Sequence, residues 1–194
     1  MKKLESSELL SLERYSRERV EFRARVMAHK KNRQVSVGPN TLWLFEDRLT
    51  VQYQVQEMLR TERIFEAEGV ADELAAYNPL IPDGSNWKVT FLIEFTDPEV
   101  RRVQLEKLKG VEDRCWVQVA GCEKLFAIAD EDLERANEIK TSAVHFLRFE
   151  LSAAMADRLK GGAALSVGID HPNYQHALEP AAENVRVALV ADLG

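Results

Sequence analysis

The sequence predicts an α+β fold in which two long N-terminal helices pack on a mostly antiparallel sheet of about six strands with shorter helices. Residues 6–68 are rich in charge and carry apolar residues at helical spacing. From Trp87 onward the apolar residues recur at every second position, as in a strand with one buried face. The expected strands do not alternate strictly with helices, which favours α+β over a doubly wound sheet.

Length and composition predict a single domain over residues 1–194. We expect it to consist of a helical part at 1–75, an ordered loop rich in proline and glycine at 76–86, and a sheet part at 87–194. Hydrophobic residues make up 45% of the chain and charged residues 30%, which is ordinary for a soluble protein with a packed core.

The charge balance and the hydropathy pattern exclude several partners. A net charge of -6 argues against a nucleic-acid binder, because phosphate contacts need a surplus of Lys and Arg. No apolar stretch approaches the roughly 20 residues that span a bilayer, and the N-terminus is too polar for a signal peptide. The only cysteines, Cys115 and Cys122, fit a reducing compartment. We therefore expect a cytoplasmic protein with no nucleic-acid or membrane partner.

Two helices are expected in the helical part. The first starts at a serine cap, residue 6 or 7, and runs to about residue 32. A turn at 38–40 and a short strand or connector at 41–45 separate it from the second helix. The second helix starts at Thr50 and runs to about residue 68, with Gly69 in the position of a C-terminal glycine.

The sheet part is expected to contain strands separated by turns and short helices. The expected strands cover residues 87–95, 115–119, 123–128, 142–151, 164–169 and 185–190, with a hairpin turn at 120–121. The expected helices cover about ten residues after Asp97-Pro98, residues 131–139 after an Asp130 cap, and the segment from Ser152 to Gly161-Gly162.

Four charged residues lie on the apolar arcs of the two long helices. Arg19 and Arg23 are on the first helix, and Glu62 and Glu66 are on the second. A buried charge is costly unless it is paired, so we expect these four residues to form structural ion pairs between the helices.

A metal site between the same helices is the alternative interpretation. Its candidate ligands are Glu57, Glu62, Glu66 and His29. Carboxylate-bridged iron bundles use a Glu-x-x-His motif on two helices, and the sequence contains none.

The remaining polar candidates lie in the sheet part. His145 and Arg148 are three residues apart on one expected strand and therefore point to opposite faces. With Lys88, Glu94 and Glu150, Arg148 can build a polar ladder across neighbouring strands, or the same face can bind a charged ligand. Asp170 and His171 follow a strand, where such residues form either a turn or a site.

No familiar catalytic or cofactor motif is present. The sequence lacks the Gly-rich phosphate loops, the metalloprotease and serine-hydrolase motifs, and any Cys/His set with zinc spacing. Whether the protein is an enzyme stays open, and no cofactor can be assigned.

Seven segments, in their order and spacing, resemble the bacterial family catalogued as domain of unknown function 3501. They are VMAHKK (26–31), LFEDR (44–48), QVQEMLRTERI (54–64), YNPLIPDG (77–84), ADED (129–132), TSAVHFLRF (141–149) and GIDHP (168–172). The family has no assigned reaction, so the resemblance implies no catalytic residue. It implies a genomic setting beside rubrerythrin-like and iron–sulfur oxidoreductase genes, and through it a role in oxidative-stress or electron-transfer metabolism.

Three functions follow as hypotheses. The first is an accessory protein that docks on a rubrerythrin-like or iron–sulfur partner through its oppositely charged segments. Independently of this role, a homo-oligomer is compatible with the sequence. The second is a metal-binding enzyme that uses Glu57, Glu62, His145 or His171. The third is a domain that binds a small anionic ligand through Arg148 or Arg60.

Overall fold

The protein has the expected α+β fold, but its strands form two sheets. The structure, a computed structural model, describes residues 2–131, 135 and 140–194. Within this part of the chain, sheet A has the order β1-β2-β3-β7-β6 and sheet B the order β5-β4-β8-β9, and every neighbouring pair is antiparallel. The expectation of one sheet of about six strands is therefore corrected to two sheets of five and four strands.

The strands are β1 (Gln34–Ser36), β2 (Thr41–Glu46), β3 (Asn86–Ile93), β4 (Cys115–Val119), β5 (Leu125–Phe126), β6 (Ile128–Ala129), β7 (Val144–Glu150), β8 (Leu165–His171) and β9 (Tyr174–Leu178). The helices are α1 (Leu12–Lys30), α2 (Arg48–Glu62), α3 (Ala67–Tyr77), α4 (Pro98–Lys107), α5 (Ala153–Lys160) and α6 (Glu183–Val190). Short 3-10 turns cover Ser6–Glu8, Asn78–Leu80 and Glu112–Arg114.

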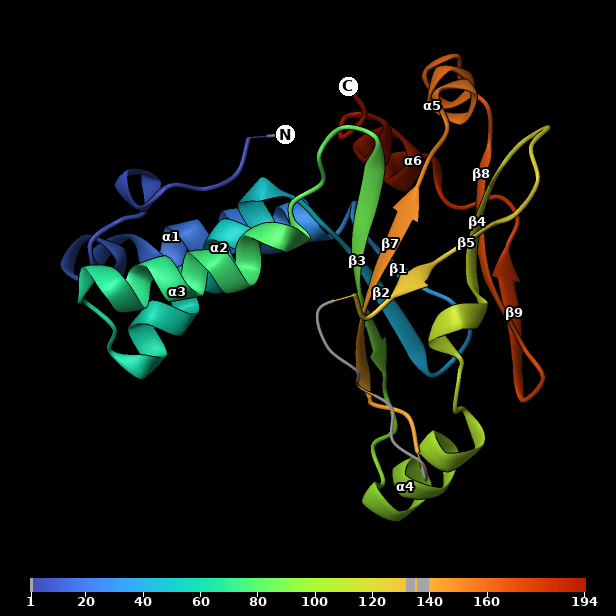
Figure 1. Cartoon of the computed structure of the whole chain (residues 1–194), viewed down its shortest axis with the longest axis horizontal. Coiled ribbons are helices and arrows are strands. Elements are labelled where there is room, and N and C mark those ends of the chain that lie inside the picture. The colour runs from blue at the N-terminus through green and yellow to red at the C-terminus, as the bar shows by residue number, and fades with distance from the viewer. Residues whose placement is uncertain (1, 132–134, 136–139) are drawn as a thin grey trace.

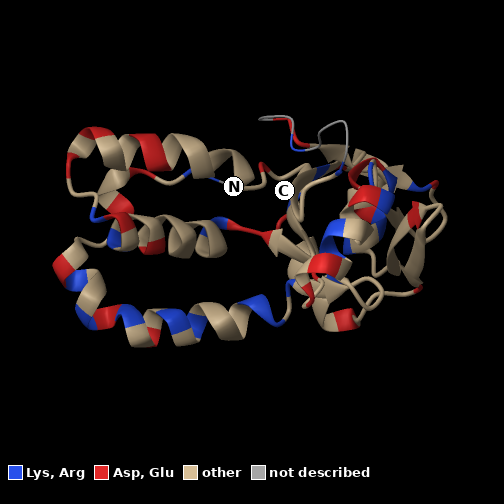
Figure 2. Ribbon diagram, turned by 90° about the horizontal axis from the view of Figure 1, so that it is seen from below, with Lys and Arg blue, Asp and Glu red and all other residues tan. Residues whose placement is uncertain are grey.

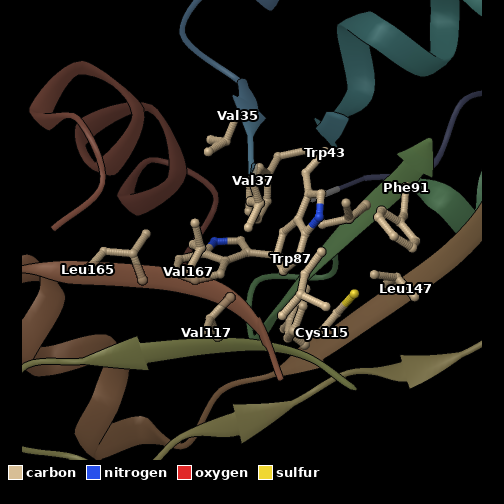
Figure 3. Close-up of a cluster of buried hydrophobic side chains, with 14 of the residues drawn as sticks. Val35, Val37, Trp43, Trp87, Phe91, Cys115, Val117, Leu147, Leu165 and Val167 are labelled. Atoms are coloured by element: carbon tan, nitrogen blue, oxygen red, sulfur yellow. The ribbon is translucent and has the colours of Figure 1, made fainter. Parts of the chain in front are cut away.

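The main hydrophobic core fills the space between the two sheets (Figure 3). Trp43, Trp87 and Phe91 extend from sheet A, and Val117 and Val167 from sheet B, and all five are buried. Every second residue of β3 enters this core, as the period of two predicts. Its other residues, among them Lys88, therefore lie on the outer face of sheet A, away from sheet B.

Helices α1, α2 and α3 form an arm that projects from the sheets (Figure 1). Helix α2 lies between α1 and α3, and the ribbon shows basic residues mixed with acidic ones along α1 and acidic residues along α3 (Figure 2). Helix α4 lies at one end of the sheets, and α5 and α6 lie at the other (Figure 1).

The expected second helix is in fact two helices. Helix α2 ends at Glu62, and Arg63 adopts a left-handed conformation with φ 56°. The chain then reverses and starts α3 at Ala67, so Gly69 lies within α3 and does not end a helix. A Cβ at Gly69 would lie 2.7 Å from the Ile64 side chain, which explains why glycine occupies this position of a tight reversal.

The helix starts also differ from expectation by a few residues. Ser11 caps α1, because residues 6–8 form a separate 3-10 turn. Asp47 caps α2 by accepting a hydrogen bond from the Thr50 amide at 2.9 Å, and the Thr50 hydroxyl accepts one from the Asp47 amide at 2.9 Å.

The C-terminal region contains the largest error of the sequence-based expectation. Residues 185–190, expected as a strand, belong to α6. Val185 and Leu189 are buried four residues apart, whereas Val187 is 55% exposed, which is helical spacing. The expected strand 164–169 instead extends to His171 and turns directly into β9, which was not expected.

Other expectations are confirmed or lie outside the described residues. Strands β2, β3, β4, β7 and β8 and helices α4 and α5 lie where they were expected. The expected strand 123–128 is split, since β5 joins sheet B and β6 joins sheet A. The expected helix 131–139 lies outside the described residues except at positions 131 and 135. Among the described residues no helix is both long and apolar enough to cross a bilayer.

Candidate functional site

A cleft of about 500 Å³ lies where the arm meets the outer face of sheet A. We call it the arm cleft. Its apolar wall comes from the end of α3, the turn that follows it and β7, and consists of Ala76, Tyr77, Pro79, Leu80, Phe146 and Leu147. Its charged lining residues are Lys88, Glu131, Arg135 and Arg148. The volume lies within the range of small-molecule sites, about 300 to 1,000 Å³.

Lys88 and Arg148 place two cations side by side on the floor of this cleft. They are directly opposed in the antiparallel β3–β7 pair, so both side chains leave the same face of the sheet. This is the polar pair that the strand patterns predicted for β3 and β7. Glu94, expected in the same ladder, lies beyond the end of β3 and is exposed.

Arg148 forms ion pairs with two carboxylates. Its Nε and Nη2 donate to the two oxygens of Glu131 at 2.7 and 2.8 Å, and its Nη1 donates to Glu150 Oε2 at 2.5 Å. The hydrogen bonds that Arg148 donates to Glu131 raise the pKa of Arg148 further above its already high value and lower the pKa of Glu131. All three guanidinium nitrogens therefore already donate to protein carboxylates.

The position of Glu150 is fixed by the loop that precedes β3. Ser85 Oγ donates to Glu150 Oε1 at 2.6 Å, and Asn86 Nδ2 donates to Glu150 Oε2 at 3.1 Å. Asn86 Nδ2 also donates to Asp83 Oδ2 at 2.8 Å. The ordered Pro-Gly loop thus holds the carboxylate that orients Arg148.

Lys88 has no such partner. Among the described residues it makes no hydrogen bond and no ion pair within 4.0 Å, although it is half-buried. Burial lowers the pKa of its ammonium, and the neighbouring Arg148 lowers that pKa further. Lys88 is therefore a cation whose donors are available to a ligand and whose charged form is destabilised.

Aromatic and cationic groups complete the cleft. The Arg135 guanidinium carbon lies 4.5 Å from the centre of the Phe146 ring, and Arg135 Nη1 lies 3.6 Å from Asp130 Oδ1. The hydroxyl of Tyr77 makes no hydrogen bond with any described residue. The arrangement offers an aromatic surface beside cationic groups.

His145 lies on the opposite face of β7 and is fully buried, as a core histidine. Its Nδ1 is 2.5 Å from Asp130 Oδ2, and its Nε2 is 3.1 Å from the Ser142 carbonyl and 3.8 Å from Glu112 Oε2. Both ring nitrogens thus face acceptors, and no ligand can reach them without displacing the core. His145 fixes Asp130, the residue next to Glu131.

The other predicted ligand residues lie away from the arm cleft. Arg60 lies in the last turn of α2 and pairs with Glu57 at 3.4 Å. Asp170 pairs with Lys124 at 2.7 Å on sheet B. His171 is buried, its Nδ1 accepts the Asn173 amide at 3.2 Å, and its Nε2 lies 3.2 Å from the Lys109 carbonyl. These three residues belong to a helix end and to the β8–β9 hairpin.

The ion pair between the two long helices forms with a different partner from the one expected. Arg19 Nε and Nη2 donate to Glu57 at 2.8 and 2.7 Å, and the Tyr15 hydroxyl donates to Glu57 at 2.7 Å. The hydrogen bonds from Arg19 lower the pKa of Glu57 to about 2. Arg23, Glu62 and Glu66 are exposed and form no ion pair within 4.0 Å with any described residue.

The metal candidates do not form a common cluster. Glu57 is engaged by Arg19, and His29 Nε2 lies 2.5 Å from Asp47 Oδ2 at the base of the arm. Within residues 2–131, 135 and 140–194, no group of three or more His, Cys, Asp or Glu side chains is arranged to hold a metal ion.

A buried arginine joins the arm to both the sheet and the C-terminal helix. Arg33 donates to the carbonyls of Phe45 at 3.0 Å, Glu46 at 3.3 Å and Ala188 at 3.2 Å. It also forms an ion pair with Asp192. This guanidinium connects segments that are far apart in the sequence and sets where the arm leaves the sheet.

Sequence reasoning missed most of the arm cleft. Tyr77, Glu131 and Arg135 come from the arm and from the segment after β6, and nothing local indicates that they meet β3 and β7. Only the shared face of Lys88 and Arg148 was visible, because two strands with a period of two place them on the polar side.

Comparisons with known proteins agree with the resemblance. The model of a family described as protein of unknown function (DUF3501) matches residues 3–193. A crystal structure of a protein of unknown function from Burkholderia pseudomallei is 49% identical, with a TM-score of 0.95 over 100% of both chains. No curated protein matches this chain. The chain belongs to the DUF3501 family.

Proposed function

We propose that this protein binds a small organic carboxylate with an apolar body in the arm cleft. The observation that carries the proposal is Lys88, a half-buried cation without a hydrogen-bond partner among the described residues, at the floor of a cleft of about 500 Å³. A buried donor that lacks a partner is costly, and an anionic ligand would remove that cost.

The lining residues favour an anion over a cation. Three cations and one carboxylate line the cleft, and the carboxylate, Glu131, is already held by two hydrogen bonds from Arg148. Because Arg148 is saturated by Glu131 and Glu150, the ligand's carboxylate would accept directly from Lys88. The wall formed by Tyr77, Leu80 and Phe146 would contact the apolar body of the ligand.

Calorimetry with 3-phenylpropionate as the probe tests the proposal. Binding to the wild-type protein is expected, and Lys88→Gln should weaken it by at least about tenfold, or about 1.4 kcal/mol. Lys107→Gln, an exposed lysine of α4 outside the cleft, is the matched control and should leave the affinity unchanged. No measurable binding, or equal binding by Lys88→Gln, would overturn the proposal.

Inorganic phosphate provides a second arm of the same experiment. It carries the charge but no apolar body, so it should compete with 3-phenylpropionate only weakly. Equal competition would mean that the wall of Tyr77, Leu80 and Phe146 adds nothing, and the apolar part of the proposal would fail.

An accessory role in a redox system is the second candidate, and the exposed face of α1 favours it. Arg17 and Arg23 make no ion pair within 4.0 Å with any described residue, and Val20 between them is 80% exposed. A basic face with an apolar centre fits an acidic protein surface. The family's genomic setting would make that partner a rubrerythrin-like or iron–sulfur protein.

Binding to the purified proteins encoded by the neighbouring genes tests this role. The double variant Arg17→Glu with Arg23→Glu should abolish the complex at low salt, and Arg102→Glu on α4 should retain it. Absence of a complex with either protein at low salt would exclude this role.

A further inference from the structure

We infer that Lys88 is a nucleophilic amine that forms a Schiff base with a 2-oxo acid bearing an apolar side chain. This inference rests on the proposed carboxylate site and extends it, because it names a reaction at the same side chain. Nothing in the family assignment gives Lys88 or the arm cleft a role.

The surroundings of Lys88 favour its neutral amine. A lysine becomes nucleophilic when its ammonium loses its proton, and proximity to a second cation or to an apolar wall favours that loss. Lys88 has both, since Arg148 is its direct cross-strand neighbour and it shares the cleft with the apolar wall at the end of α3. Arg148 and Lys3 lower the pKa of its ammonium by repulsion, whereas Glu131 and Asp83 raise that pKa by attraction.

Arg148 is held in place beside Lys88. Its guanidinium donates two hydrogen bonds to Glu131 on one side and one to Glu150 on the other, and Ser85 and Asn86 hold Glu150 in turn. A free arginine would swing away from Lys88 and relieve the repulsion. The clamped one keeps its charge beside the amine.

Both the amine and a proton donor are available in the arm cleft. No described carboxylate lies within 4.0 Å of the Lys88 ammonium to keep it charged, in contrast to Lys124, which pairs with Asp170 at 2.7 Å. The Tyr77 hydroxyl lines the same cleft and makes no hydrogen bond with any described residue. It is available to protonate a departing hydroxyl group.

The reaction balances without any further reactant. The Lys88 Nζ lone pair attacks the keto carbon, the C–N bond forms as the C=O π bond breaks, and a proton moves from the nitrogen to the oxygen, which becomes the hydroxyl of a carbinolamine. That hydroxyl leaves as one water with a proton from the Tyr77 hydroxyl, and the C=N bond forms as a protonated imine beside the tyrosinate. The carboxylate of the 2-oxo acid would accept a hydrogen bond from the imine N–H, and the apolar side chain would lie against Phe146 and Leu80.

Borohydride trapping with phenylpyruvate tests the inference. After reduction, peptide mass spectrometry should find the adduct on Lys88 at a rate at least tenfold above that of exposed lysines such as Lys107. Prior addition of 3-phenylpropionate should protect Lys88. Lys88→Arg should abolish the adduct while the protein stays folded by circular dichroism.

Arg148→Gln separates activation from mere proximity. Without the neighbouring cation the Lys88 ammonium keeps its proton to higher pH. The rise of the trapping rate with pH should therefore occur at a higher pH in the variant than in the wild type. An unchanged pH profile would show that Arg148 does not activate Lys88 and would overturn the inference.

The remaining outcomes distinguish this inference from the proposed function. If 3-phenylpropionate binds but phenylpyruvate leaves no adduct on Lys88, the Schiff base is refuted and the binding site stands. Adducts spread evenly over the lysines also refute it. If neither compound binds, both proposals fail.

Discussion

Lys88 and Arg148 face each other in register across the β3–β7 pair, and of the two only Arg148 pairs with a described carboxylate. Arg148 has Glu131 and Glu150, whereas Lys88 has neither. Directly opposed like charges destabilise an antiparallel pair. Arg148 is therefore expected to stabilise the fold, and Lys88 to destabilise it.

Lys88→Met is expected to raise the free energy of unfolding by roughly 0.5 kcal/mol, because it removes the repulsion and retains the packing of the side chain. Arg148→Met is expected to lower it by about 1 to 3 kcal/mol, since Glu131 and Glu150 lose their hydrogen bonds. Urea denaturation measures both, with Arg102→Met on α4 as the surface control. Shifts of the same sign in the two cleft variants would contradict the prediction.

Glu57 is expected to make the arm sensitive to acid. Arg19 holds the pKa of this carboxyl at about 2, below its ordinary value of 4.5. A depressed carboxyl pKa stabilises the folded state above the ordinary pKa, and that stabilisation is lost as the pH falls from about 4.5 towards about 2.

Arg19→Met removes this effect and should lower the free energy of unfolding at neutral pH only modestly, because the pair is partly solvated. The difference in unfolding free energy between the wild type and Arg19→Met should shrink across that acid range. Arg23→Met, which lies on the same helix and makes no ion pair with a described residue, is the control. A difference independent of pH would refute the assignment to Glu57.

Glu46 is expected to show the opposite dependence. Its carboxyl is buried and accepts hydrogen bonds from the Thr50 and Thr90 hydroxyls at 2.5 and 2.6 Å. Burial raises its pKa despite these bonds, so the ionised form disfavours the folded state at neutral pH. That cost disappears as the pH falls through the raised pKa.

Glu46→Gln should therefore be more stable than the wild type at neutral pH, because the amide buries no charge. The advantage should shrink as the pH falls through the raised pKa of the wild-type carboxyl. Chemical denaturation across this pH range measures the effect, with the exposed Glu94→Gln as the control. A variant less stable than the wild type at neutral pH would contradict the prediction.

Gly168 is expected to tolerate no side chain. A Cβ on this residue of β8 would lie 2.6 Å from Trp116 Cε2 and 3.0 Å from the His176 carbonyl oxygen. Trp116 is buried and cannot move away without disturbing the core. Gly168→Ala should lower the free energy of unfolding by about 1 to 3 kcal/mol.

Thermal unfolding measures the loss, and tryptophan fluorescence should report the displaced indole. Ser166→Ala on the same strand is the control and should change the stability little. A stability of Gly168→Ala equal to that of the wild type would contradict the prediction, because it would mean that the close contacts around Gly168 cost nothing to relieve.

The alternating strands could be predicted because their signal is local. The pattern of Trp87, Val89 and Phe91 states which face is buried. It does not state which sheet covers that face. The chain passes from sheet B to sheet A around Ala127, between two strands of two residues each, and pairing partners far away in the sequence decide that switch.

The errors in the helices have a related origin. Residues 185–190 are rich in valine and resemble a strand, yet α6 buries Val185 and Leu189 and leaves Val187 in solvent. Tertiary burial overrides a β-branched composition. Arg19 pairs with Glu57 and not with Glu62 or Glu66, because α2 ends at Glu62 and leaves both of those carboxylates in solvent.

The sequence could predict only part of the candidate site, because only the pairing of alternating strands is a local signal. Lys88 and Arg148 share a face because a strand alternates, and the sequence contains that information. Tyr77 reaches them only because α3 turns back at Arg63 and ends over sheet A. Because Arg63 is left-handed without being a glycine, the sequence alone does not indicate this reversal.

The hydrogen bonds of Arg33 also bear on the order of events during synthesis. This guanidinium meets Ala188 and Asp192, residues 155 and 159 positions later in the chain. Helices α1 and α2 leave the ribosome long before those partners exist, so the base of the arm must wait with an exposed cation until α6 has been made. The arm can become helical early, but its orientation, and with it the shape of the cleft, is completed last.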